Sequence, residues 1–199
     1  MGRGVRRLSL AVFAAVIVAT AGCETTSLAP ADPPVVEPVG QSTVRGGSGQ
    51  IWAVVDYRAA RHGLGGNWMV LDVAVTAADR QTVRLTRDRV FLRNPNGKRL
   101  PLLTQAEFLK SYSEIRGPLQ RADVASNPLW AYFPSNRRPC RFDFFKAPGG
   151  GVAYDEVEVN DRRACRELLV FSVPGGVQPG RWVLGLDAEE SSIRIPFDL

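Results

Sequence analysis

The chain has 199 residues, 45% of them hydrophobic and 23% charged, which is the composition of a folded protein with a sizeable core. It has 25 Lys and Arg against 20 Asp and Glu, but three of the arginines lie within the first seven residues. From residue 23 onward the counts are 22 basic and 20 acidic side chains. This near-neutral balance argues against nucleic-acid binding, which depends on a strongly basic surface.

The first 22 residues have the organisation of an export signal. Three arginines near the N-terminus are followed by an uncharged, mostly apolar run over residues 8–21. A bilayer-spanning helix needs roughly 20 apolar residues, so this run is short for a span. It has the length of the hydrophobic region of a secretory signal. Two small residues, Ala21 and Gly22, then precede Cys23.

The sequence Ala21-Gly22-Cys23 resembles the lipobox of bacterial lipoprotein precursors, with Thr20 where that family usually has leucine. The resemblance implies a signal peptide over residues 1–22 and acylation of Cys23, which would anchor the chain in a lipid bilayer of the cell envelope. Glu24 replaces the aspartate that favours inner-membrane retention in this family, so a periplasm-facing protein of the outer membrane is favoured over one of the inner membrane. The alternatives are an ordinary signal cut near Ala21, or an uncleaved membrane anchor.

Residues 23–49 are rich in proline and glycine, and we interpret them as a tether between the anchor and a folded domain. Proline favours extended conformations, and the glycines near residue 49 loosen the chain. Fully extended, a tether of this length reaches up to about 80 Å. The alternative is that residues 35–39 add an edge strand to the domain.

Residues 50–199 predict a single β domain. Apolar, β-branched runs over 51–57 and 68–76 indicate its first two strands, and the alternation of the second is that of a half-buried sheet. The Asn96-Gly97 pair predicts a tight hairpin. The other predicted strands cover residues 82–86, 89–93, 98–102, 141–145, 152–159, 166–173, 180–187 and 192–199.

One helix interrupts the predicted strands. Thr104 and Glu107 have the spacing of a capping box, which predicts a short helix near residues 105–115 that ends at Gly117-Pro118. Residues 119–139 then predict a long irregular loop.

That loop contains Trp130, Tyr132 and Phe133, and loops of its length in compact domains are often functional. The three aromatic residues are therefore a candidate binding loop for a sugar or a protein. The alternative is that they plug one end of the fold.

About eight strands with short turns and one inserted helix predict a mostly β fold, an antiparallel sandwich. The segments 168–174, 182–186 and 193–197 resemble the final strands of immunoglobulin-like domains found on bacterial envelope lipoproteins. The resemblance implies an immunoglobulin-like sandwich over residues 50–199. It transfers no functional residue.

Two cysteines remain once Cys23 is assigned to lipid. In an oxidising compartment, Cys140 and Cys165 favour a disulfide. Closing a loop of this length would stabilise the fold by about 3 kcal/mol. Separate free thiols and a redox pair are the alternatives, and no Cys-x-x-Cys spacing favours the redox pair.

No set of residues predicts catalysis, and we expect neither a cofactor nor a metal. His62 is the single histidine, so a cluster of histidine ligands is excluded, and no serine stands in a Gly-x-Ser-x-Gly motif. The acidic residues between 155 and 161 lack EF-hand spacing and are typical of a solvated strand face.

The expectation is therefore a membrane-anchored envelope lipoprotein that acts as a non-enzymatic interaction or structural module. Its expected partner is another protein of the envelope. The alternative function is binding of cell wall or carbohydrate through the aromatic loop.

Overall fold

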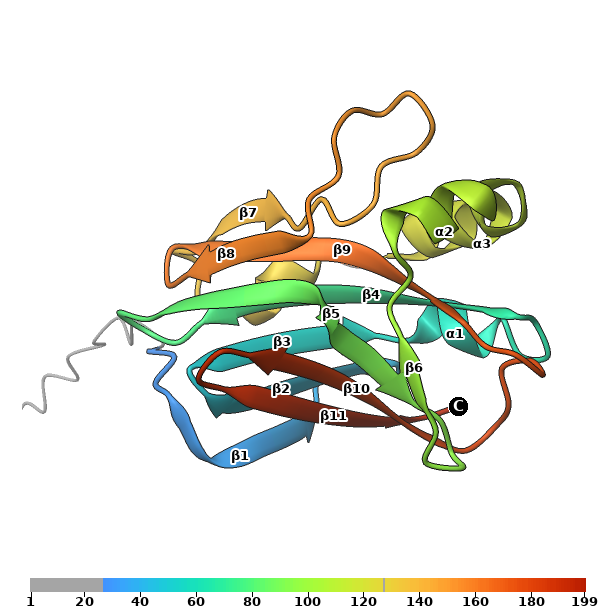
Figure 1. Ribbon diagram of the computed structural model, residues 1–199. Coiled ribbons are helices and arrows are strands. Elements are labelled where there is room, and N and C mark those ends of the chain that lie inside the picture. Colours follow the sequence, from blue (N-terminus) through green and yellow to red (C-terminus); the bar gives the residue numbers. More distant parts are fainter. Residues whose placement is uncertain (1–26, 127) are drawn as a thin grey trace, which may run out of the picture.

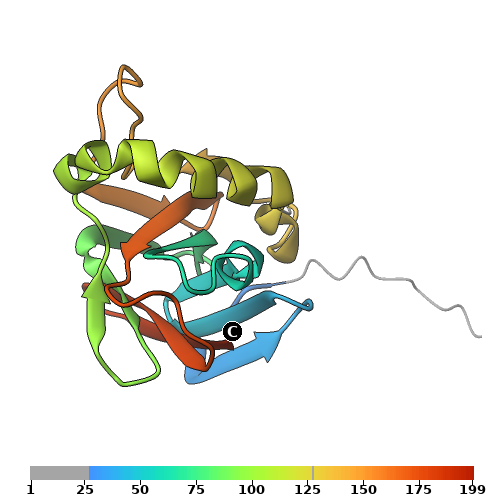
Figure 2. The same ribbon diagram turned by 90° about the vertical axis from the view of Figure 1, so that its right-hand side faces the viewer.

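The computed structural model describes residues 27–126 and 128–199. Two β-sheets pack face to face, and the helices α2 and α3 lie on the outer side of the larger sheet (Figures 1 and 2). The mostly β, sandwich-like prediction is confirmed, with eleven strands in the described residues instead of about eight. No helix in the described part of the chain has the length and apolar character needed to cross a bilayer.

The larger sheet has six strands in the order β1-β2-β3-β4-β9-β7. Its pairings are antiparallel except for the parallel pair β7 and β9. The first four strands follow one another along the chain, whereas β9 pairs with β4 across a long sequence separation. The strands are β1 (Ala31–Pro38), β2 (Thr43–Gly49), β3 (Ile51–Asp56), β4 (Trp68–Ala77), β7 (Arg138–Arg141) and β9 (Arg163–Ser172).

The smaller sheet has the order β11-β10-β5-β6, and β8 pairs with the first half of β5. Its strands are β5 (Thr82–Arg93), β6 (Arg99–Pro101), β8 (Glu156–Asn160), β10 (Arg181–Ala188) and β11 (Ser192–Asp198). The predicted hairpin at Asn96-Gly97 is confirmed as the β5–β6 turn, where Gly97 has a φ of 80° that glycine adopts readily.

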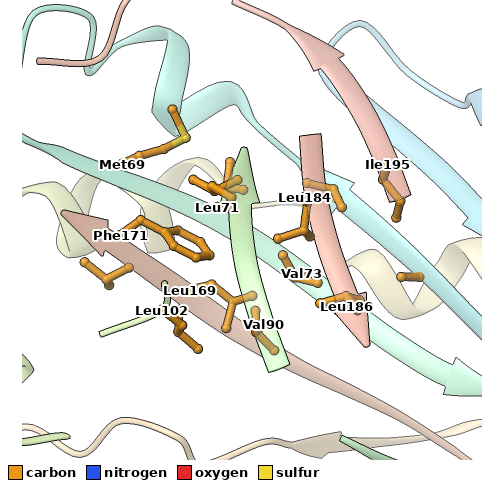
Figure 3. Packing of buried hydrophobic residues seen from close by; sticks show 14 of the residues in the cluster. Met69, Leu71, Val73, Val90, Leu102, Leu169, Phe171, Leu184, Leu186 and Ile195 are labelled. Atoms are coloured by element: carbon orange, nitrogen blue, oxygen red, sulfur yellow. The ribbon is translucent and has the colours of Figure 1, made fainter. Parts of the chain in front are cut away.

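The main core fills the space between the two sheets (Figure 3). Alternate residues of β4, from Met69 to Val75, point inward, as their spacing predicts. They meet Leu169 and Phe171 from β9 and Leu184 from β10. Fully burying one such side chain stabilises the fold by about 1.5–3 kcal/mol, so this layer is the main source of stability.

The outer face of the larger sheet is also covered. A second apolar cluster there joins Leu28, Val54, Ala74, Leu129 and Phe133. The last two come from the short 3₁₀ helix η1 (Leu129–Tyr132) and the residue that follows it. The helix α1 (Arg58–Arg61) lies between β3 and β4, beside α3. As a result, β4 is buried on both faces.

The tether predicted over residues 23–49 is wrong for its second part, because β1 and β2 belong to the sheet. β1 is an edge strand, the position in a sheet that tolerates proline. The glycines of β2 do not loosen the chain; they let neighbouring side chains pack directly against the β2 backbone. A Cβ on Gly47 would lie 2.7 Å from the Trp52 ring, and one on Gly46 would lie 3.1 Å from Ile193.

The helix expected near 105–115 is a pair of helices, α2 (Gln105–Lys110) and α3 (Tyr112–Ala125). The capping box is confirmed: Thr104 Oγ1 accepts a hydrogen bond from the Glu107 amide at 3.2 Å, and Glu107 Oε2 accepts one from the Thr104 amide at 2.8 Å. The predicted stop is wrong, since Pro118 lies inside α3.

The loop expected over 119–139 is correspondingly wrong. It is divided between the second half of α3, η1 and the start of β7.

Candidate functional site

A groove of about 530 Å³ lies beside β9. Helices α2 and α3, the exposed Trp130 of η1, the end of β7 and the segment 145–147 border it. Grooves of this size that combine apolar walls with a few polar groups are typical ligand sites. We therefore treat it as the candidate binding site.

The apolar wall of the groove is aromatic. Phe108 of α2 stacks on Phe145 with ring centroids 4.7 Å apart, and Tyr112 of α3 lies 5.7 Å from Phe108. The capping box fixes the start of α2 and so the position of Phe108. Trp130 is 40% exposed and adds a large indole that solvent reaches. Such surfaces bind sugar rings or apolar side chains.

Arg166 lies in the floor of the groove and forms an ion pair with the buried Asp72. Arg166 of β9 donates to Asp72 Oδ1 of β4 at 2.6 Å, and these residues are neighbours on the outer face of the sheet. Burial raises the pKa of Asp72 to about 6, against the opposing effect of Arg166. Another nitrogen of the Arg166 guanidinium, Nη2, is buried and forms no hydrogen bond among the described residues. It lies 3.9 Å from Asp123 Oδ1.

A second buried acid, Glu167, lies at the groove where β9 passes the end of β7. Its Oε2 accepts a hydrogen bond from the Asp143 amide at 2.8 Å, and its Oε1 is 3.8 Å from the Arg141 guanidinium. Burial raises the pKa of Glu167 to about 7, although Arg141 and the Asp143 amide favour the ionised form. Carboxyl groups with raised pKa values in a groove often mark functional sites.

The predicted disulfide is confirmed. Cys140 of β7 is bonded to Cys165 of β9, and the two residues are direct partners in the parallel register. Cys140 also lines the groove, so the bond holds that edge of the groove against the sheet. Cys23, the predicted lipidation site, lies outside the described residues.

The three aromatic residues of the predicted binding loop are separated in the structure. Trp130 lines the groove, but Phe133 is buried in the second apolar cluster. Tyr132 is half-buried against the same cluster, and its backbone carbonyl accepts a hydrogen bond from Arg45 Nη1 at 3.1 Å. Phe133 and Tyr132 therefore pack η1 on the sheet and hold Trp130 at the surface.

The other titratable residues of interest lie elsewhere. His62 is exposed at the end of α1, and it borders a smaller hollow of about 150 Å³. In the acidic segment, Glu158 is the strand partner of Arg84, and Asp155 pairs with Arg87 at 3.2 Å. Within the described ranges, no group of three or more His, Cys, Asp or Glu side chains could hold a metal ion.

The charged residues of the groove were missed by sequence reasoning. Asp72 and Glu167 each interrupt an apolar strand, and a charge in such a run is the local signal that could have drawn attention to them. No protein-family model, curated protein or solved structure matches this chain.

Proposed function

We propose that this chain is a lipid-anchored lipoprotein of the bacterial envelope and that it acts as a non-enzymatic binding module. The export-signal pattern and Cys23 support the anchor. The Cys140–Cys165 bond supports an oxidising compartment such as the periplasm. The proposal includes an immunoglobulin-like topology, which is supported by the apolar, β-branched sequences of the last three strands. Outer-membrane sorting is supported by Glu24.

The binding site in this proposal is the groove beside β9, and its ligand is a segment of an envelope protein. The observation that supports it best is Arg166 Nη2, a buried cationic N–H group with no hydrogen bond among the described residues. A segment with an apolar side chain and a nearby carboxylate would satisfy this nitrogen while it packs on Trp130, provided that the exposed Asp123 side chain, 3.9 Å from the nitrogen, moves aside. A hydrogen bond to a charged group is among the stronger polar contacts in proteins.

Site-specific photo-crosslinking in the producing cell tests this function. A photoreactive residue at Trp130 should give a discrete crosslinked product with one envelope protein. The same residue at Val35, which is 40% exposed like Trp130 but lies on the far edge strand β1, should not. Replacement of Arg166 by Gln should weaken the product at position 130. Equal products at both positions would reject the groove as the binding site.

The second candidate function is binding of cell wall or carbohydrate, and the exposed indole of Trp130 supports it. Stacking of a sugar ring on this indole predicts that the protein sediments with isolated wall material. Trp130→Ala should reduce that binding about tenfold, whereas Tyr154→Ala, which removes another exposed aromatic side chain, should not change it. Unchanged binding by the Trp130 variant would exclude this use of the groove.

A further inference from the structure

The chain is fixed at the point where it enters the domain. Ser27 Oγ donates to Asp79 Oδ2 at 2.7 Å, and the Leu28 amide donates to the same oxygen at 3.1 Å. Arg137 Nη2 donates to Asp79 Oδ1 at 2.6 Å, and the Leu28 side chain is buried in the second apolar cluster. Ser27 is therefore held against the β4–β5 turn, at the left-hand end of the sandwich in Figure 1.

Cys23 is only four residues before this attachment point, and four residues span at most about 14 Å. An acyl group at Cys23 would therefore keep this end of the domain close to the bilayer. The same holds if the apolar run over residues 8–21 is itself the anchor, since it ends two residues before Cys23.

Four exposed arginines surround the attachment point, and we call them the arginine rim: Arg80, Arg138, Arg162 and Arg163. Hydrogen bonds from backbone amides hold together the chain segments that carry these arginines. The Arg80 amide donates to Asp161 Oδ2 at 2.8 Å, and the Arg138 amide donates to the Arg162 carbonyl at 2.7 Å. Within residues 27–126 and 128–199, none of the four guanidinium groups forms an ion pair.

The acidic groups near the rim neutralise it only in part, because Asp161 is a single carboxylate beside four guanidinium groups. Asp79 is engaged by Arg137 and by the chain start, and Asp161 accepts from a backbone amide. Glu189 and Glu190 lie on the β10–β11 turn beside Thr82, on the side of the smaller sheet. Four like charges without partners repel one another, and an anionic surface would offset that repulsion.

We propose that the arginine rim docks on acidic phospholipid headgroups of the membrane that anchors the chain. This inference rests on the anchoring proposed above. An acyl group and a basic patch together bind a membrane more firmly than either alone. Each arginine near an acidic surface is expected to shift the docked-to-undocked ratio about fivefold. Docking would also orient the domain, with the β5–β6 turn at the end that faces away from the bilayer (Figure 1).

The test uses the full chain, isolated from membranes of the bacterium that makes it and reconstituted in vesicles. A dye attached through Gln81→Cys, next to the rim, reports energy transfer to dye-labelled headgroups, and the chain without that substitution controls for stray labelling. Transfer should be higher in vesicles of phosphatidylcholine with phosphatidylglycerol than in phosphatidylcholine alone, and high salt should abolish the difference. Changing Arg138 to Gln should lower the docked ratio about fivefold, and changing all four rim arginines should lower it several-hundred-fold.

The matched control removes four other exposed charges by changing Arg89, Lys98, Lys110 and Arg116 to Gln, and it should dock like the natural chain. Equal transfer in neutral and acidic vesicles, or equal losses in both quadruple variants, would overturn the rim proposal. Failure of the anchor is a separate result, because a chain that is not anchored would not float with vesicles of phosphatidylcholine alone.

Discussion

Glu167 links burial to pH-dependent stability. The pKa of its carboxyl is about 7 in the folded chain, because burial disfavours the charged form, against an ordinary value of 4.5. Between pH 4.5 and about 7, the Glu167 carboxyl is mostly protonated in the folded chain and mostly ionised in the unfolded chain. The free energy of unfolding therefore falls as pH rises through this window, and Asp72, with a pKa of about 6, contributes in the same direction.

We predict that Glu167→Gln raises the free energy of unfolding at about pH 8 by up to about 3 kcal/mol and flattens its dependence on pH between about 5 and 8. The amide keeps an oxygen that can accept the Asp143 hydrogen bond and removes the cost of ionisation. Urea unfolding at several pH values measures this. Glu156→Gln, at an exposed position of β8, is the control and should leave the profile unchanged. A less stable variant with the natural pH profile would contradict the prediction.

Gly185 makes room for an aromatic side chain on the outer face of the smaller sheet. Phe91 is its strand partner and is 1% exposed, although it belongs to neither apolar cluster. The guanidinium carbons of Arg99 and Arg194 lie 3.8 and 4.9 Å from the ring centroid. Phe91 is thus covered by two arginines and by the bare backbone of Gly185.

Gly185→Ala should therefore destabilise the protein by about 1–3 kcal/mol, because the new Cβ would overlap the Phe91 ring. Thermal unfolding measures the loss. Gly117→Ala in α3 is the matched control, and it should stabilise the protein instead. Alanine is favoured over glycine in a helix by about 1 kcal/mol, and the new Cβ would make an ordinary contact of 3.4 Å with Arg121. Equal stability of Gly185→Ala and the natural chain would show that Phe91 can move freely.

The strand β7 depends on its disulfide. It has four residues, and among the described strands it pairs with β9 alone, at the edge of the sheet. Replacing Cys140 and Cys165 by Ser should lower the free energy of unfolding by about 3 kcal/mol, because the loop between them is no longer closed in the unfolded chain.

Amide hydrogen exchange should locate the change at the β7–β9 pair, while exchange between β4 and β9 stays slow. The reduced natural protein should behave like the double variant. A uniform rise in exchange over both sheets would show instead that the disulfide stabilises the whole fold.

The elements that were predicted correctly from sequence have local causes. The alternation in β4, the Asn96-Gly97 turn and the capping box each involve residues close in sequence. The errors come from distant contacts. β1 and β2 pair into the sheet despite their prolines and glycines, and α3 continues through Pro118 because Ile115 and Ala122 are buried.

The candidate site shows the same division between local and distant signals. Trp130 was identified because an aromatic residue in a proline-rich stretch is visible locally. Arg166 and Asp72 are 94 residues apart, so only the folded chain brings Asp72 to the arginine in the floor of the groove.

At the scale of the whole molecule, the proposed anchor would determine where the groove can work. The strands begin at Ala31 and the chain is held at Ser27, so the reach from Cys23 is about 14 Å instead of the 80 Å expected of a long tether. If the chain is anchored as proposed, a partner that binds the groove would have to come close to the same membrane.

Mass spectrometry of the mature N-terminus tests the anchor. We predict a chain that begins at Cys23 and carries acyl groups. Cys23→Ser should release the protein from the membrane fraction or leave it as an unprocessed precursor, whereas Ser27→Ala should remain acylated. An unmodified N-terminus near Gly22 would reject lipidation and leave the description of the two sheets unaffected.

The pairing of β4 with β9 has a consequence for the order in which the chain folds. β1 to β4 can form as successive hairpins, but β4 keeps an open, apolar edge until residues 163–172 arrive. Closing such a long loop is entropically costly, which slows folding. During synthesis this edge is open to pairing with another chain. A product truncated before Arg163 would keep the edge permanently, so it is expected to aggregate or be degraded.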